Sequence, residues 1–98
     1  MSYKKFRWSK DYEAAEEELE LFLDSRGHDL TRHEVVADSQ LPTMVLKHPR
    51  QLWCAEGSMR LHFGSAVVTL QPGDGLIVDA RQAHSGHSGV AGCVWYEK

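Results

Sequence analysis

The 98-residue sequence has few cysteines, no long apolar run and no block of basic residues. No stretch approaches the roughly 20 apolar residues that a membrane-spanning helix needs, and no hydrophobic segment follows the basic N-terminus, so we expect neither a membrane span nor a secretory signal. The absence of a basic stripe argues against nucleic-acid binding. Cys54 and Cys93 form no CxxC pair, and we expect two buried thiols in a reducing cytoplasm.

What the sequence does contain begins with an aromatic arm and an acidic helix. Residues 1–8 carry three aromatic side chains, which we expect to pack on the domain or on a partner subunit. Residues 9–27 have helical periodicity, with Ser9 as a candidate N-cap and Gly27 as a stop signal. The predicted apolar face comprises Tyr12, Ala15, Leu19, Phe22 and Leu23. The opposite face is rich in glutamate, which is typical of a solvated surface.

After Gly27 the pattern changes to short strands separated by turn residues. The predicted strands are residues 30–37, 43–46, 51–55, 59–63, 66–70, 76–78 and 90–96. Gly57 marks a predicted turn between two of them, and Glu56 and Asp74 are interpreted as turn residues. Strands spaced in this way predict a sandwich or a barrel.

One segment, residues 72–84, joins a Pro-Gly turn to a short apolar strand and a second turn that ends on His84. It resembles the second conserved motif of the cupin superfamily, and the turn at Glu56-Gly57 and the hairpin over residues 59–74 resemble small cupins as well. The resemblance implies a mostly β fold, a cupin-type jelly-roll β-barrel with one N-terminal amphipathic α-helix. It implies a single domain over residues 1–98, with an arm (1–8), a helix (9–27) and a barrel (28–98).

The resemblance also implies a role for His84, because the matching residue in cupins is usually a metal ligand. The first cupin motif normally supplies two histidines and a glutamate, but here the glutamate position holds Arg50 and residues 43–46 contain no histidine. His48 is the only candidate, and it lies out of register. Iron, manganese, nickel or zinc would need three or four converging ligands, which one histidine cannot supply.

Arg50 has two interpretations. If it takes the inward position of the missing glutamate, it repels a metal ion and can join His84 in holding a carboxylate or a phosphate. Alternatively, it lies in the loop at Pro49 and points to water. Among the other candidates, His62 is predicted to face outward and His87 to lie in a solvated loop, while Cys54 could face the interior.

Two functions follow as hypotheses. The first is a non-catalytic or weakly metal-binding cupin that holds a small polar or anionic ligand with His84 and Arg50. The alternative is a metal-dependent enzyme of the dioxygenase or isomerase type. It would use His84, a displaced His48 and a further ligand, namely His62, Asp79 or water. We also expect a homodimer, because small cupins commonly pair through edge strands, with the arm and the C-terminal strand as candidate contacts.

Overall fold

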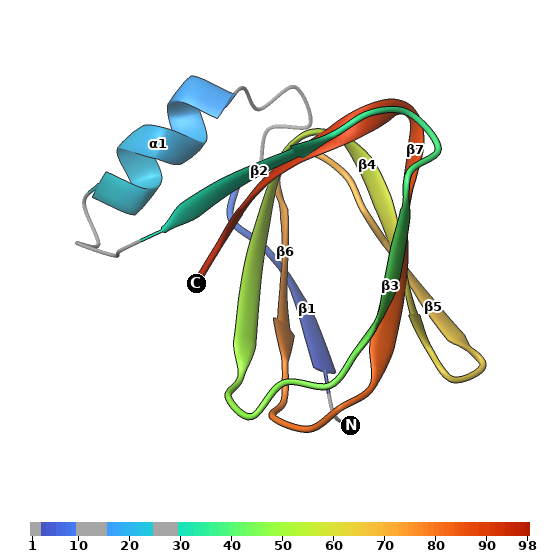
Figure 1. Ribbon diagram of the computed structural model, residues 1–98. Helices are drawn as coiled ribbons and strands as arrows, with labels where there is room; N and C mark the ends of the chain where they lie inside the picture. The colour runs from blue at the N-terminus through green and yellow to red at the C-terminus, as the bar shows by residue number, and fades with distance from the viewer. Residues whose placement is uncertain (1–2, 10–15, 25–29) are drawn as a thin grey trace.

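The computed structural model describes residues 3–9, 16–24 and 30–98. In these residues one helix and seven strands follow one another along the chain (Figure 1). They are β1 (Tyr3–Arg7), α1 (Glu16–Asp24), β2 (Thr31–Val35), β3 (Gln40–Met44), β4 (Arg50–Phe63), β5 (Ala66–Leu70), β6 (Asp74–Val78) and β7 (His84–Glu97). No helix in the described part of the chain is long and apolar enough to cross a membrane.

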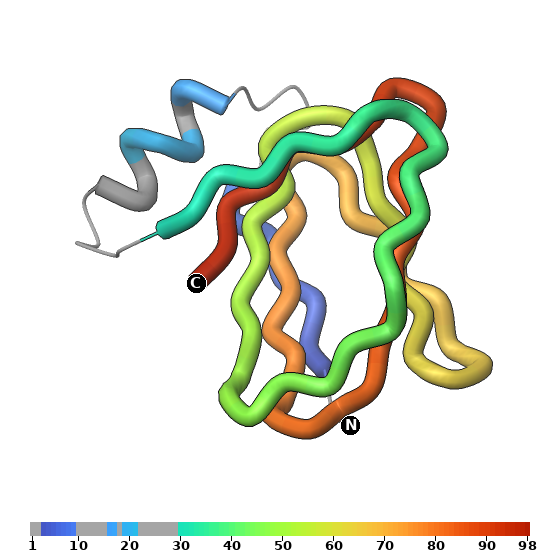
Figure 2. Tube along the Cα trace, in the orientation of Figure 1, coloured from blue at the N-terminus to red at the C-terminus, as the bar shows by residue number. Residues whose placement is uncertain are grey.

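The strands form one antiparallel sheet around two long central strands. Its order is β1-β6-β4-β7-β2, with β3 also paired to β7 and β5 also paired to β4. The sheet is strongly curved, so that β2 and β3 lie nearer the viewer than β1 and β6 (Figure 2). The prediction of a mostly β fold is therefore confirmed.

The side chains of β4 and β7 point alternately to an inner and an outer face of the sheet. On the inner face Leu52, Cys54 and Trp95 belong to the larger apolar cluster. On the outer face Trp53 and Tyr96 pack with Leu19 of α1 and with Trp8 of the arm. Successive side chains of a strand point to opposite faces, so these two strands supply both clusters at once.

The helix lies within the predicted range 9–27. Leu19, from the predicted apolar face, is fully buried. Ser9 is described, but the residues that it would cap are not, and Gly27 and the other side chains of the apolar face lie outside what the structure describes. The acidic face is not wholly solvated, because the Tyr96 hydroxyl lies 2.8 Å from a carboxylate oxygen of Glu16 and 2.8 Å from one of Glu20, and donates its single proton to one of them at a time.

The predicted turn at Gly57 is wrong, because β4 runs through it as one strand. The register against β7 shifts on both sides of this position, which indicates a bulged strand rather than a reversal. Gly57 has a φ of +71°, and a Cβ there would lie 2.1 Å from the carbonyl oxygen of Gly92. The two strands approach so closely that only glycine fits, and this contact cannot be read from local sequence.

The aromatic arm is also more ordered than expected, since it forms β1 and pairs with β6 of its own domain. Asp74 is no mere turn residue: it is buried, accepts a 2.7 Å hydrogen bond from Arg7 and lies 3.6 Å from Lys5. Trp8 donates its indole N–H to the carbonyl oxygen of Cys54 at 2.9 Å. The arm therefore packs on the domain, one of its two expected partners.

Candidate functional site

Arg50, the first residue of β4, points into the protein and is 6% exposed. The hypothesis that it points to water is wrong, because the strand begins directly after Pro49 and its first side chain falls on the inner face with Leu52. Its Nη1 lies 2.9 Å from Nε2 of His84 and 3.4 Å from Sδ of Met44. Its Nη2 donates to Oε1 of Glu97 at 2.7 Å.

The contacts of His84 fix its tautomer. The side chain is 2% exposed, and Nδ1 lies 2.9 Å from the carbonyl oxygen of Gln82. A carbonyl only accepts, so Nδ1 carries the proton, and Nε2 accepts the hydrogen bond from Arg50. His84 is therefore a neutral imidazole whose free lone pair is already used by the guanidinium.

Glu97 completes the group and was missed by the sequence reasoning. Burial alone would raise its pKa, but hydrogen bonds from Arg50 and Trp95 and the charges of Arg50 and His33 outweigh burial and lower the pKa of this carboxyl. The Trp95 indole N–H donates to the same Oε1 at 3.0 Å. The only sequence signal for Glu97 is its place in the alternation, two residues beyond Trp95 on the same face.

We call Arg50, His84 and Glu97 the polar centre. Its formal charge is zero, because the guanidinium and the carboxylate cancel and the imidazole is neutral. One donor is left over: Nε of Arg50 is buried and has no hydrogen-bond partner among the described residues. Buried polar groups are nearly always satisfied, so this orphaned donor points to an acceptor beyond the described residues, and a bound ligand can supply it.

The donor set around His84 does not fit a metal ion. Nε2, the atom that would bind the metal, already accepts from Arg50. A divalent ion about 4 Å from the guanidinium would meet a repulsion of roughly 8 kcal/mol at an effective dielectric of 20. Among the described residues, no group of three or more His, Cys, Asp or Glu side chains could hold a metal.

The structure brings Arg50 and His84 together but not the other proposed ligands. His48 and Asp79 are exposed, and neither is hydrogen-bonded to His84 within the described residues. His62 lies on the outer face, as predicted, where β4 pairs it with Ser85. A metal held by His84 and His48 stays a prediction, and the hydrogen bond between Arg50 and Nε2 of His84 argues against it.

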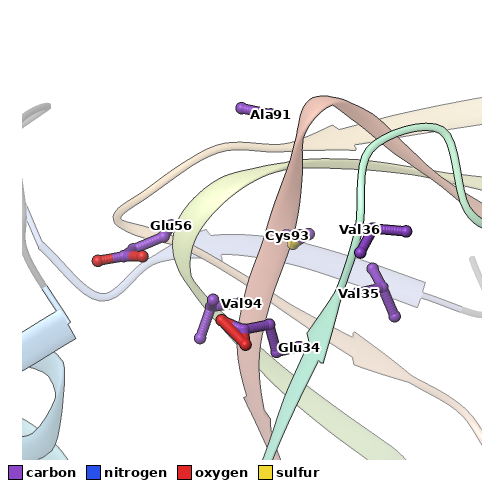
Figure 3. Close-up of a pocket in the computed structure, with 7 residues that line it drawn as sticks. All are labelled: Glu34, Val35, Val36, Glu56, Ala91, Cys93 and Val94. Carbon is purple, nitrogen blue, oxygen red and sulfur yellow. The ribbon is translucent and has the colours of Figure 1, made fainter.

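The cysteines are buried and free, as expected of two thiols in the interior. Their sulfurs lie 3.9 Å apart, and hydrogen bonding to Cys93 together with burial raises the pKa of Cys54 far above its ordinary value. Cys93 also lines a surface cavity of about 330 Å³, beside Glu34 and Glu56 (Figure 3). Because the raised pKa keeps Cys54 protonated, the Cys54 thiol is a poor nucleophile.

No protein-family model and no curated protein sequence matches this chain. Solved structures do match. A protein of unknown function from Rhizobium leguminosarum bv. viciae 3841 aligns with 69% of this chain and 64% of its own, at 15% identity and a TM-score of 0.65. A cupin-2 domain containing protein from Shewanella frigidimarina NCIMB 400 aligns with 70% of this chain and 67% of its own, at 13% identity and a TM-score of 0.62.

A cupin superfamily protein from Desulfitobacterium hafniense DCB-2 aligns with 97% of this chain and 73% of its own, at 11% identity and a TM-score of 0.64. The chain therefore has the fold of the cupin superfamily, as its motifs predicted. It spans slightly less than two thirds of the Rhizobium protein. Because one fold hosts many chemistries, the function must be argued from the polar centre.

Proposed function

We propose that this chain is a non-catalytic, cupin-type jelly-roll barrel that holds a small polar or anionic ligand against Arg50. One observation carries the proposal: Nε of Arg50 is buried without a partner among the described residues. A buried unsatisfied donor costs about 1–3 kcal/mol, and more for a charged group. An acceptor atom supplied by a ligand removes that cost.

The charge of the polar centre narrows the class of ligand. Glu97 already neutralises Arg50, and protonation of His84 at Nε2 would sacrifice the hydrogen bond from Arg50. A monoanion would leave the centre at −1, whereas a dianion would leave −2 in a poorly solvated interior. We therefore expect a neutral carbonyl or hydroxyl group or a single carboxylate rather than a phosphate dianion.

We expect a ligand to reach Arg50 past the side chain of Met44. Its thioether makes the longest of the contacts to Arg50, at 3.4 Å, and sulfur is a weak acceptor. Met44 ends β3 and precedes the exposed residues 45–49. Because methionine is unbranched and adapts its shape at low cost, its side chain can move aside for a ligand.

The test is an NMR titration of ¹⁵N-labelled protein with acetate, lactate, N-methylacetamide and, as the dianion, methylphosphonate. The Trp95 indole N–H shares its acceptor with Arg50 and therefore reports on the polar centre. We expect a saturable shift of this signal with a monocarboxylate or amide, and a weaker one with the phosphonate.

Two variants test whether the shift of the Trp95 signal reports binding at Arg50. Arg50→Lys keeps the charge but removes Nε, and it should weaken binding about tenfold. Lys47→Gln removes an exposed charge from the loop before β4 and should leave binding unchanged. The proposal fails if no probe moves the Trp95 signal. It also fails if the purified protein carries one equivalent of metal that His84→Ala loses, because that result favours the metal-dependent enzyme.

A further inference from the structure

A second polar group lies on the outer face of β3, β7 and β4. Strand pairing sets His87 of β7 directly opposite both Gln40 of β3 and Arg60 of β4. The same pairing of β4 with β7 sets His62 opposite Ser85, two residues away along each strand. These five residues and Gly86 line a cavity of about 340 Å³, which we call the outer cavity.

The outer cavity is separate from the polar centre. Arg60 and His62 alternate along β4 with Met59, Leu61 and Phe63, which are buried in the inner cluster. Adjacent side chains of a strand point to opposite faces, so the sheet itself stands between the two sites. A ligand in one cannot contact the residues of the other.

Arg60 is the one fixed charge among the described residues that line the outer cavity, and no carboxylate belongs to that lining. The side chain of Arg60 has no hydrogen-bond or ion-pair partner among the described residues, and the residue is exposed. Outside the lining, Oδ1 of the exposed Asp38 lies 3.7 Å from Nε2 of His87, so a bound anion must compete with this carboxylate for His87. On the side of β5, the residues opposite Arg60 and His62 are the neutral Thr69 and Val67.

The spacing of these side chains suits one small anion. Directly opposed residues of antiparallel strands have Cβ atoms about 5 Å apart, and diagonal neighbours about 7–8 Å apart. Arg60, His62 and His87 can therefore reach a single group lodged between them. Arg60 lies directly opposite His87. If His87 is protonated, the two positive charges repel each other across the strands, and an anion between them removes that repulsion.

We propose that the outer cavity binds a small oxyanion, either inorganic phosphate or the phosphate group of a larger molecule. Arg60 supplies a two-pronged set of N–H donors, which matches phosphate geometry. The imidazoles of His62 and His87 supply further donors, and the hydroxyl of Ser85 adds a neutral one.

The experiment is a titration of ¹⁵N-labelled protein with inorganic phosphate, at constant ionic strength set by chloride. We expect saturable shifts of the Ser85, Gly86 and His87 amides. Arg60→Gln should weaken the affinity at least about tenfold. Lys4→Gln is the matched control: it removes one exposed charge from β1, outside the lining of the outer cavity, and should leave the affinity unchanged.

The titration separates this site from the polar centre and identifies the source of the phosphate. Arg50→Lys should keep the shifts at residues 85–87, because its side chain lies on the other face. Tighter binding of phenyl phosphate than of inorganic phosphate would indicate a larger ligand, and equal binding would indicate the free ion. The proposal is overturned if phosphate produces no saturable shift at these amides, or if Lys4→Gln and Arg60→Gln weaken binding equally.

Discussion

Replacing Arg50 with methionine removes a buried charge from the polar centre while keeping an unbranched side chain. Arg50 is 6% exposed and is hydrogen-bonded to both His84 and Glu97. Removing one partner of a buried ion pair costs about 3–5 kcal/mol, because the other charge stays buried and unpaired. For a domain of this size, each kcal/mol lowers Tm by roughly 4–8 °C, so we expect a fall on the order of 20 °C.

The loss should depend on pH. The lowered pKa of Glu97 stabilises the wild-type fold above the ordinary carboxyl pKa of about 4.3, and this stabilisation disappears as the pH falls through the lowered value. In Arg50→Met we expect burial, the largest single cause, to raise the pKa of Glu97, because the hydrogen bond and the charge of Arg50 are gone. The charged carboxylate then destabilises the variant at neutral pH and is relieved on acidification. The difference between wild type and variant should therefore shrink from pH 7 to pH 4.

Urea unfolding at both pH values measures this difference, and a double-mutant cycle with Glu97→Gln isolates the pair. Glu97→Gln keeps an oxygen that accepts from Trp95. The combined variant should be less destabilised than the sum of the single variants, by about 2 kcal/mol. A loss under about 1 kcal/mol for Arg50→Met at pH 7, with no coupling to Glu97, would show that Arg50 is solvated and would refute the reasoning.

Further predictions concern the fold. Gly57→Ala should cost about 3 kcal/mol or more in urea unfolding, from strain and from overlap with Gly92, whereas Gly64→Ala, with open space around it, should cost roughly 1–2 kcal/mol. Leu19→Ala should cost about 2–5 kcal/mol in thermal unfolding, because the fully buried side chain joins α1 to the sheet. Asp74→Asn should speed hydrogen exchange of the β1 amides about tenfold or more, since it weakens the pairing with Arg7. Equal costs for the two glycine variants, a neutral Leu19→Ala or unchanged β1 exchange would each contradict the packing described.

The elements that the sequence predicted well are those set by the local alternation of apolar and polar side chains. The strand predicted over residues 66–70 is β5 with the same limits. The inward set of Met59, Leu61 and Phe63 is buried as predicted. Turn chemistry also worked at Gly73, whose φ of +97° needs a residue that tolerates this conformation.

The elements that it missed depend on contacts distant in sequence. The arm forms β1 by pairing with β6, and Arg7 also bonds to Asp74, which lies 67 residues away. β7 begins at His84 rather than near residue 90, because β3 and β4 extend the pairing over the glycine- and serine-rich stretch. Glu97 was not among the candidate residues, and only the pairing of β7 with β4 places it beside Arg50.

The most direct test of the polar centre is a high-resolution crystal structure of untagged protein purified without chelator, with anomalous data collected for transition metals. We predict non-metal density within hydrogen-bond distance of Nε of Arg50, with Nη1 still bonded to His84. An anomalous peak at Nε2 of His84, with Arg50 turned to solvent, would contradict the account. So would an Arg50 whose Nε meets only bulk water.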